Sequence, residues 1–594
     1  MNLRYPLALS LCVPLAISSL TATASAAGDR THNRTDQIIV RFSDPYADGH
    51  LKANGLSRQI GKHLEFVRET SLGSTVYKLP TKESLPQVKG LVQALMATSD
   101  VEYAEADRML FAIAALQDPP TEGTLSSDGS PVYDLQWHYH EPTGGMDAPG
   151  AWAQLDSTDA PVRVAVLDTG YTDHPDLVAN IDAESGRDMV HDTYISNDGD
   201  GRDADARDPG DWTDRNYCYQ GWPGYDSSWH GTHVAGTVSA VTNNSAGVAG
   251  VGYNLIKVIP VRVLGQCGGY SSDIADGIRW AAGLEVDGET LAAPAQVINM
   301  SLGGSGTCTP DSEYQLAIND AVARGTTVVV AAGNSNADAG DFTPASCANV
   351  VSVAATGRTG DRAYYSNYGS VVDLAAPGGD MSGSSGDGVL STMNSGATDP
   401  AEPTYAYYQG TSMAAPHTAA VAALLYIAKA GIAPNEVEAV LKDSTRSFPG
   451  SCSGCGTGIL SAGAAMTTAA GGGSIEPVPT VPAAPTDVSV LPGDGTAFVS
   501  WQDNSDNETG FVIERKQKIN KNRWSSFTEI DITSVNYFDD SGLDGTYIYR
   551  VRARNEAGDS TYAESDAVTI ATTSSDGDTD DGSGSCKGNG PKCR

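Results

Sequence analysis

Short, strongly apolar runs rich in β-branched residues alternate with helix-like patterns over residues 137–466 of this 594-residue chain. Such runs are typical of strands buried on both faces, as in a parallel sheet covered by helices. The expected strands are 162–167, 258–263, 296–300, 326–331 and 350–354, and the expected helices are 230–241, 275–282, 313–323 and 412–428. The alternation predicts an α/β fold with a doubly wound, mostly parallel sheet, whose sites lie at the carboxyl ends of the strands.

Three motifs in this region supply an acid, a base and a nucleophile. Asp168 ends an apolar run and precedes Thr-Gly, His230 begins His-Gly-Thr-His, and Ser412 lies in Gly-Thr-Ser-Met-Ala before a long apolar helix. A serine needs a histidine to take its proton, and the histidine needs a buried carboxylate to fix its tautomer and stabilise the imidazolium. The motifs therefore predict nucleophilic catalysis by Ser412.

These motifs, and their order along the chain, resemble those of the subtilisin-like serine proteases, from about Trp137 to about Met466. The resemblance implies that His230 is the base and that the nearby His233 is structural. It also implies that Asn334, which ends Ala-Ala-Gly-Asn, donates to the oxyanion together with the Ser412 N–H. The expected activity is a serine endopeptidase that works through an acyl-enzyme.

The same resemblance implies two segments that hold an extended peptide substrate by β-pairing. The implied substrate-binding residues are Gly268, Gly269, Tyr270, Ser301, Leu302, Gly303, Ala331, Ala332 and Gly333. Hydrogen bonds to the substrate backbone do not distinguish its side chains. A first pocket lined by small, uncharged residues admits large apolar side chains. We therefore expect broad specificity with a preference for such side chains. The contribution of Asp338 and Asp341, in the loop 335–343, is left open.

Two groups of oxygen-bearing residues suggest structural calcium, which prefers oxygen ligands. Asp176 matches a ligand of the family, and the loop 243–248 resembles one that supplies a side-chain amide and carbonyls, here from Asn244, Ala246 and Val248. The second group is Asp198, Asp200, Asp203 and Asp205. The second group lacks the final glutamate and flanking helices of an EF-hand, so a solvated acidic loop is an equal alternative.

The beginning of the chain predicts export and processing. Residues 1–26 have a basic start, an apolar stretch and Ala-Ser-Ala, as a secretory signal does, whereas a membrane anchor would need a longer apolar stretch. Residues 27–116 resemble the inhibitory pro-domain of subtilases, a small α+β unit, with an unrelated domain as the alternative. Residues 117–132 are rich in Asp, Pro, Gly and Ser and are expected to be a cleavable linker.

The catalytic domain is expected to span residues 133–470, followed by a Gly- and Pro-rich linker at 471–485. Alternating strands then predict a β-sandwich at 486–572. Trp501, Tyr549 and the sequence Asn-Glu-Ala-Gly at 555–558 resemble a fibronectin type III domain. The acidic tail 573–594 is expected to be disordered.

Cysteine usage agrees with an exported protein, because Cys12 lies in the signal and an even number of cysteines follow it. Sequence does not fix their pairing, and a redox role for Cys452 and Cys455 is an alternative, although no thioredoxin-like pattern surrounds them. Joining neighbours along the chain predicts the pairs Cys218–Cys267, Cys308–Cys347, Cys452–Cys455 and Cys586–Cys593.

The net charge of −36 argues against nucleic acid as a partner, because phosphate binding needs Lys and Arg. No segment after the signal is apolar enough for a membrane span. We expect a secreted, extracellular monomer that binds protein and peptide substrates and is inhibited by its own pro-domain. An inactive binding protein is disfavoured by the intact motifs. A metallo-hydrolase that uses the acidic loop is the remaining alternative.

Overall fold

The computed structural model describes most of the chain outside its two ends and several internal stretches. The described residues are 34–112, 135–156, 159–450, 452–472, 482–505, 508–521, 523–555 and 558–572. The predicted signal, the linker 117–132 and the tail with Cys586 and Cys593 lie outside them. The chain divides into two compact units, Met1–Ile475 and Glu476–Arg594, and this division falls within the predicted linker 471–485.

A seven-stranded parallel sheet forms the centre of the first unit, as the sequence predicts. Its strands, in spatial order, are β15 (Leu374–Pro377), β14 (Val351–Thr356), β12 (Thr327–Ala331), β10 (Val297–Met300), β6 (Val162–Asp168), β8 (Ile256–Arg262) and β7 (Arg187–Asp188). The five predicted runs correspond to β6, β8, β10, β12 and β14 to within two residues. The edge strands β7 and β15 were not predicted, because they are short and carry no periodic pattern.

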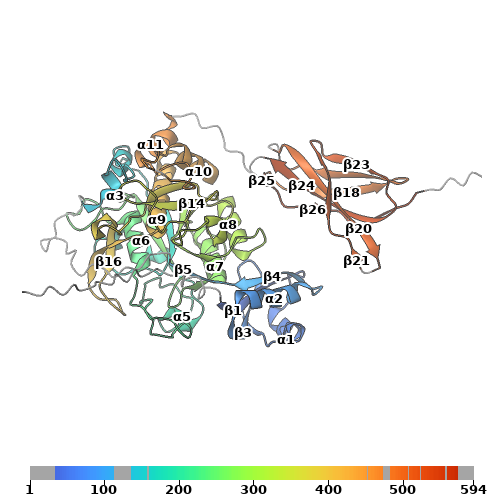
Figure 1. The fold of residues 1–594 in the computed structure, drawn as a ribbon, viewed down its shortest axis with the longest axis horizontal. Helices are drawn as coiled ribbons and strands as arrows, with labels where there is room; N and C mark the ends of the chain where they lie inside the picture. The colour runs from blue at the N-terminus through green and yellow to red at the C-terminus, as the bar shows by residue number, and fades with distance from the viewer. Residues whose placement is uncertain are drawn as a thin grey trace, which may run out of the picture. The chain divides into compact units, whose positions relative to one another are not determined.

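Helices cover both faces of this sheet (Figure 1). Val164 and Val166 of β6 pack in one apolar cluster with α6 (His230–Ser239) and α9 (Thr411–Ala428). Ala165 and Leu167, which alternate with them, pack in a second cluster with α7 (Ser271–Ala281) and α8 (Glu313–Ala323). Because successive side chains of a strand point to opposite faces, these clusters are the two helix layers of an α/β sandwich.

The predicted helices are found with small shifts at their ends. The largest shift is in α7, which begins four residues before the predicted start at residue 275. Its first turn is capped from elsewhere in the chain, because the Ser272 N–H donates to Asp107 Oδ1 at 3.0 Å. This bond satisfies an N–H in the first turn, which has no acceptor inside the helix. Because the acceptor is distant in the chain, the local sequence pattern did not indicate the early start of the helix.

The apolar helix α9 runs through the centre of the first unit and is buried from Thr411 to Leu425. Among the described residues, it is the one helix long and apolar enough to cross a membrane, and 83% of that apolar window is buried inside the protein. Pro416 is the sixth residue of the helix, not a first-turn residue as its sequence position suggests. Its missing N–H leaves the Ser412 carbonyl oxygen without a helical donor, and that oxygen instead accepts from Ser301 Oγ at 2.8 Å.

The N-terminal part of the first unit contains a four-stranded sheet, in the order β2-β3-β1-β4, and two helices. Its elements are β1 (Arg34–Phe42), α1 (Gly49–Ile60), β2 (Glu65–Glu69), β3 (Thr75–Ser84), α2 (Leu85–Met96) and β4 (Val101–Asp107). They enclose a separate apolar cluster that includes Val40, Leu56 and Val88. We refer to residues 34–107 as the N-terminal domain.

The other described elements of the first unit are short. They are β5 (Met109–Ala112), α3 (Trp137–His140), α4 (Ala148–Trp152), α5 (Thr193–Ser196), β9 (Gly269–Tyr270), β11 (Leu302–Ser305), β13 (Phe342–Thr343), β16 (Val389–Asn394), β17 (Pro403–Tyr408), α10 (Pro434–Asp443) and α11 (Ala462–Thr467). The strands β16 and β17 pair antiparallel.

The second unit consists of antiparallel strands in two sheets, one ordered β18-β19-β23 and one built around the pair β20–β24. The strands are β18 (Thr486–Pro492), β19 (Thr496–Gln502), β20 (Gly510–Asn520), β21 (Arg523–Trp524), β22 (Thr528–Thr533), β23 (Tyr537–Ser541), β24 (Gly545–Asn555), β25 (Gly558–Asp559), β26 (Ala563–Glu564) and β27 (Val568–Ile570). Both sheets contribute to one apolar cluster, in which the rings of Trp501 and Phe511 meet edge to face at 5.3 Å.

Three disulfides link parts of the first unit and are three of the four predicted pairs. They join Cys218 to Cys267, Cys308 to Cys347, and Cys452 to Cys455. The first closes a loop with a sequence separation of 49 residues, and loops of this length gain roughly 3–4 kcal/mol from restriction of the unfolded chain.

Two buried histidines pair beside α9. His138 Nδ1 lies 2.8 Å from His417 Nε2, and His417 Nδ1 lies 2.6 Å from the Met413 carbonyl oxygen. Because that carbonyl can only accept, His417 carries its proton on Nδ1, and its Nε2 accepts from His138. Burial lowers the pKa of His417 to about 4 and that of the nearby His233 to about 3, and it lowers the pKa of His138 in the same direction.

We predict that acid destabilises the protein through this group. A histidine in the unfolded chain titrates near about 6.5, so the unfolded state binds protons first, and stability falls as pH drops below about 6.5 toward the folded pKa values. His138→Gln keeps a donor for His417 but cannot be protonated. We compare Ser412→Ala with Ser412→Ala/His138→Gln between about pH 6.5 and 4. The unfolding free energy of the variant with His138→Gln should fall less steeply with decreasing pH, and the two slopes should differ by up to about 1.4 kcal/mol per pH unit. Equal slopes in urea unfolding would contradict this prediction.

Candidate active site

Asp168 is the last residue of β6 and is completely buried at the carboxyl edge of the sheet. Its Oδ1 accepts from the Thr169 N–H at 2.8 Å and from His230 Nδ1 at 2.7 Å. Gly170 follows with a φ of 103°, a conformation that favours glycine and turns the chain sharply after the strand. The carboxylate is therefore buried but hydrogen-bonded, as its burial requires.

His230 is the first residue of α6, whose residues are all buried. The helix approaches the Asp168 turn closely, because a Cβ added to Gly231 would lie 2.1 Å from the Gly170 carbonyl oxygen. The Gly231 N–H also donates to Thr169 Oγ1 at 3.0 Å. With Nδ1 facing Asp168, the other ring nitrogen, Nε2, has no hydrogen-bond partner within the described part of the chain.

Ser412 lies in the first turn of α9 and is completely buried. Its Oγ donates to the Ser301 carbonyl oxygen at 3.0 Å, and Ser301 Oγ donates to the Ser412 carbonyl oxygen at 2.8 Å. This reciprocal pair fastens the start of α9 to the end of β10. In this conformation the recorded partner of the Ser412 hydroxyl is Ser301 rather than His230.

Asn334 follows β12 at the same edge of the sheet. Its Oδ1 accepts two hydrogen bonds from Thr411, one from the backbone N–H and one from Oγ1, both at 2.9 Å. These bonds fix the orientation of the amide group beside the start of α9. The three predicted catalytic motifs and Asn334 thus come from β6, α6, α9 and the end of β12.

The predicted substrate segments flank a strand of the chain itself. In a four-stranded sheet of order β13-β11-β5-β9, β5 pairs antiparallel with both neighbours. Leu302 lies opposite Ala112, Gly303 opposite Phe111, and Gly269 opposite Leu110. The sequence pattern did not predict β5 as a strand, because it is too short to show a period and its pairing partners are remote in sequence; only the resemblance to subtilase pro-domains implied that the end of this segment lies in the cleft.

The residues of the other predicted substrate wall lie at the end of β12 and just after it. Ala331 and Ala332 are buried, and the Gly333 N–H donates to Thr411 Oγ1 at 3.1 Å. In the nearby loop, Asp338 Oδ1 accepts from the Gly340 N–H, and the Asp341 carbonyl oxygen accepts from the Gly306 N–H. The Asp338 side chain thus stabilises a turn of its own loop, whereas the Asp341 bond is made by its backbone and joins the loop to Gly306.

A second acidic group lies next to the predicted triad and was missed by sequence reasoning. Thr169 Oγ1 donates to Asp208 Oδ2 at 2.7 Å, and Asp211 accepts from the backbone and hydroxyl of Ser228. Burial raises the pKa of Asp208, and the negative charge of Asp211 raises it further. The sequence did not distinguish Asp208 and Asp211 from the other aspartates of the same acidic stretch.

The first predicted calcium group comes together in space. Asn244 Nδ2 lies 2.5 Å from Asp176 Oδ1, and the Val248 N–H donates to Asp176 Oδ2 at 2.9 Å. Asp176 is 2% exposed, and no lysine or arginine among the described residues forms an ion pair with it. Asp176 is therefore a buried carboxylate that accepts from neutral donors and has no cationic partner in the described part of the chain, beside the amide group of Asn244. Carboxylate and amide oxygens are ligands that calcium prefers.

The second predicted calcium group, the acidic loop 198–205, differs from the first because two of its carboxylates already have cationic partners. Asp198 forms an ion pair with Arg262 at 2.6 Å, and Asp205 forms one with Arg207, also at 2.6 Å. Asp203 Oδ1 accepts from the Asp205 N–H, and Asp200 takes part through its backbone. Arginine neutralises the carboxylates that a metal would need. Among the described residues, no group of three or more acidic, histidine or cysteine side chains could hold a metal ion.

A family profile described as "Subtilase family" matches residues 159–458, half of the chain, and these residues contain every predicted catalytic residue. The chain belongs to the subtilase family. Subtilases are serine endopeptidases, and the geometry of Asp168 and His230 agrees with that chemistry.

Relatives of this subtilase include proteases named as extracellular. An "Extracellular protease" of Xanthomonas campestris is 47% identical over 412 residues, which cover 69% of this chain and 66% of the relative. An "Extracellular basic protease" of Dichelobacter nodosus is 40% identical over 455 residues, which cover 73% of this chain and 71% of the relative. The chain thus spans about two thirds of the length of the first relative.

Two solved structures are similar to this subtilase. A protease from Pseudoalteromonas arctica is 56% identical with a TM-score of 0.55, over 57% of this chain and 99% of that one. Fervidolysin from Fervidobacterium pennivorans has a TM-score of 0.51 at 18% identity, over 89% of this chain and 88% of that one, which shows the fold alone.

We predict that Gly231→Ala impairs catalysis by displacing His230. The added methyl group would collide with the Gly170 carbonyl, so α6 must move away from Asp168. A displacement of this kind should lower kcat on a small peptide substrate by about 10- to 100-fold, with a smaller change in KM. Gly383→Ala is the matched control, because a Cβ there meets nothing within 4 Å. An unchanged kcat in Gly231→Ala would contradict the role given to this close approach.

Proposed function

We propose that this subtilase is a secreted serine endopeptidase that is made as an inactive precursor and matures through its own active site. The observation that carries the proposal is the hydrogen bond between His230 Nδ1 and Asp168 Oδ1 at the sheet edge where Ser412 also lies. The names of the extracellular relatives support secretion, to which the predicted signal at residues 1–26 would direct it.

In the proposed reaction, Ser412 Oγ attacks the carbonyl carbon of the scissile peptide bond and His230 Nε2 takes the hydroxyl proton. Asp168 stabilises the resulting imidazolium and keeps its ring in place. The imidazolium then gives the proton to the leaving amine, and water hydrolyses the acyl-enzyme by the same steps. For attack, the Ser412 hydroxyl must exchange its hydrogen bond to the Ser301 carbonyl for one to His230.

The tetrahedral intermediate carries a negative charge that needs fixed donors. Ser412 lies in the first turn of α9, where backbone N–H groups and the helix dipole favour negative charge. We assign the second donor to the Asn334 side-chain amide, whose orientation Thr411 fixes through Oδ1. In enzymes of this kind, one such donor contributes about 10²–10³ in kcat.

The proposed specificity is broad, with a preference for large apolar side chains. Substrate would pair through its backbone with β11 and β9, as β5 does, and backbone pairing does not select side chains. Small residues wall the first pocket from both sides, at Ser301–Gly303 and Ala331–Gly333, and they leave room for a large side chain.

We infer that residues 27–116 act as an inhibitory pro-domain. Three contacts support this role: β5 fills the position between the substrate segments, Asp107 caps α7, and Glu105 Oε1 accepts from the Glu313 N–H at the start of α8 at 2.8 Å. A chain that pairs where substrate pairs blocks the site by competition. Cleavage in the predicted linker 117–132 would release it.

Residues 486–572 are proposed to form a fibronectin type III-like β-sandwich. Two antiparallel sheets around Trp501 and Tyr549 support it. None of the proposed catalytic or substrate-binding residues lies in this part of the chain, so we assign it to attachment, for instance to large protein substrates, with residues 471–485 as the linker.

Calcium is proposed to bind at Asp176, together with Asn244 and the carbonyl oxygens of Ala246 and Val248. A bound divalent cation supplies positive charge to a buried carboxylate and so stabilises the native state. None of these ligands belongs to the catalytic group. The role of the ion would therefore be structural.

Ser412→Ala tests the catalytic proposal. We expect this variant to accumulate as a folded precursor that keeps residues 27–116, because the site that cuts the linker has lost its nucleophile. Peptide hydrolysis should fall to background, and N-terminal sequencing of the secreted product should give a residue before the linker. A product of mature size that retains full activity would refute the assignment of Ser412.

Asp176→Ala tests the calcium proposal. In the Ser412→Ala background, excess chelator should lower the midpoint of thermal unfolding. Calcium at about 100 times its Kd stabilises the native state by about 2.7 kcal/mol, and the chelator removes this contribution. Asp176→Ala should show the lowered midpoint with or without chelator. Asp205→Ala, from the arginine-paired acidic loop, is the control and should respond like the parent. Equal midpoints of the parent in calcium and in chelator would refute a bound structural ion.

A further inference from the structure

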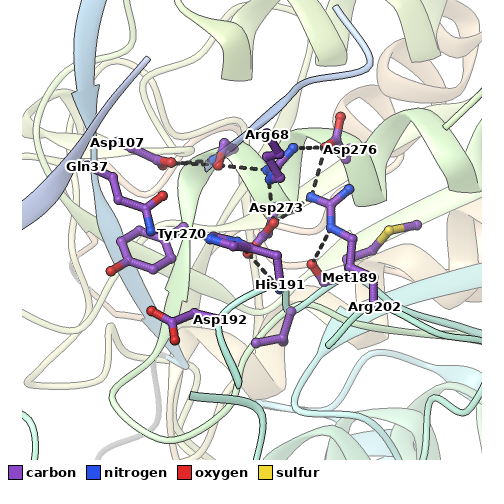
Figure 2. Close-up of polar contacts among 12 residues, drawn as sticks. Gln37, Arg68, Asp107, Met189, His191, Asp192, Arg202, Tyr270, Asp273 and Asp276 are labelled. Carbon is purple, nitrogen blue, oxygen red and sulfur yellow. Dashed lines mark hydrogen bonds and ion pairs between the residues drawn. The ribbon is translucent and has the colours of Figure 1, made fainter. Parts of the chain in front are cut away.

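Helix α7 carries two buried carboxylates at the surface that meets the N-terminal domain (Figure 2). The side chains of Asp273 and Asp276 are only 1% and 2% exposed. They lie three residues apart and so project from the same side of the helix. Two buried negative charges this close together need compensating cations.

One cation comes from the catalytic part of the chain. Arg202 Nη2 lies 2.5 Å from Asp273 Oδ1 and 2.8 Å from Asp276 Oδ2, while its Nε donates to the Met189 carbonyl oxygen at 2.9 Å. His191 Nδ1 lies 2.7 Å from the other oxygen of Asp273. These contacts hold both carboxylates in place from the catalytic side.

The second cation comes from the N-terminal domain. Arg68, on β2, donates through Nη1 to Asp276 Oδ2 at 2.8 Å and through Nη2 to Asp273 Oδ1 at 2.9 Å. Nη2 also donates to Ser272 Oγ at 2.9 Å, and the Ser71 N–H donates to Asp276 Oδ1 at 2.9 Å. The Arg68 side chain is 15% exposed, so the contact is largely shielded from water.

The two carboxylates are better compensated when both parts of the chain are present. With Arg68 in place, two guanidinium groups face Asp273 and Asp276. Without it, Arg202 is the one guanidinium among the described residues that still contacts the pair; it is shared with Asp287 at 3.2 Å, and the His191 ring remains beside Asp273. Neighbouring contacts have the same polarity, because Arg41 of β1 pairs with Glu313 at 3.2 Å and Lys78 of β3 pairs with Asp192 at 3.6 Å.

We propose that Asp273, Asp276 and Ser272 form an arginine-binding socket, and that Arg68 in this socket is a main determinant of how tightly and how selectively the N-terminal domain holds the catalytic domain. The proposal rests on the inhibitory role assigned above to residues 27–116. It adds that recognition depends on an arginine–carboxylate clamp remote from the substrate cleft, in addition to the pairing of β5.

The chemistry of the socket selects arginine over lysine. Its acceptors belong to two separate carboxylates and a hydroxyl, and the planar fork of a guanidinium reaches all of them with two nitrogens. A lysine ammonium is a single point charge on a flexible stem. An N-terminal domain that lacks an arginine at this position would leave the two buried carboxylates with one guanidinium, that of Arg202, which is shared with Asp287.

The test measures release of the N-terminal domain from the full chain. In the Ser412→Ala background, a recognition sequence for a site-specific protease is placed in residues 117–132, and the chain is cut there. Dissociation of the N-terminal fragment is then followed by size-exclusion chromatography and by fluorescence of a label on that fragment. The variants are Arg68→Gln, Arg68→Lys, Asp276→Asn and the double variant Arg68→Gln/Asp276→Asn.

We expect Arg68→Gln to speed dissociation by at least about tenfold, as is typical when one member of a buried charge pair is truncated. Arg68→Lys should be intermediate. Asp276→Asn should also speed dissociation, and the double variant should be no faster than the faster single variant, because both changes remove the same interaction. Arg58→Gln is the control and should match the parent, because within the described part of the chain the contact of the Arg58 side chain is with the Asn54 carbonyl of the same helix, α1.

Two results would overturn the socket. In the first, the Arg68→Gln fragment dissociates at the same rate as the Arg58→Gln fragment. In the second, the rate increases of Arg68→Gln and Asp276→Asn multiply in the double variant. If Arg68→Gln does not fold, Asp276→Asn and Arg68→Lys decide by the same criterion. The inhibitory role is tested separately in the active enzyme, where peptide hydrolysis should appear only as the fragment leaves. If peptide hydrolysis appears before the N-terminal fragment dissociates, the inhibitory role fails. The socket still stands in that case, provided that Arg68→Gln speeds dissociation of the fragment.

Discussion

The central parallel sheet brings the carboxyl ends of β6, β10 and β12 to one edge, and the rest of the site is built against that edge. Asp168 ends β6, Ser301 follows β10, and Asn334 follows β12. The other two side chains come from helices that pack on one face of the sheet. Close packing of α6 is possible because Gly231 meets the Gly170 carbonyl without a side chain between them. Backbone contact at this point sets the separation of His230 and Asp168.

Buried carboxylates are satisfied in different ways in this protein, and the difference indicates their roles. Asp168 faces a histidine, as the proposed proton transfer requires, whereas Asp273 and Asp276 face arginines, which keep them charged and in place. Asp176 is buried with neutral donors, which leaves its charge without a cation. The partner of a carboxylate therefore separates catalytic, structural and candidate metal-binding residues that look alike in the sequence.

The N-terminal domain contributes groups to the catalytic domain at several separate points. Asp107 and Glu105 satisfy N–H groups at the starts of α7 and α8, and Arg68 faces the carboxylates of α7. The strand β5, which directly follows the domain, completes a small sheet. Each contact satisfies a polar or charged group that would otherwise need water. Removal of the domain would expose these groups together, which links its binding to the electrostatics of the catalytic surface as well as to the cleft.

The sequence by itself determined the strands of the sheet, most helix positions and the motifs around Asp168, His230 and Ser412, because apolar periodicity and short-range turn chemistry are local properties. It did not determine β5, the early start of α7 or the group formed by Arg68, Arg202 and Asp273, since each depends on residues distant in the chain. Nor did it separate the acidic loop at 198–205 from a metal site. That distinction depends on Arg262, which lies about 60 residues away in sequence and reaches Asp198 only in the folded protein, where burial forces a charge to find a partner.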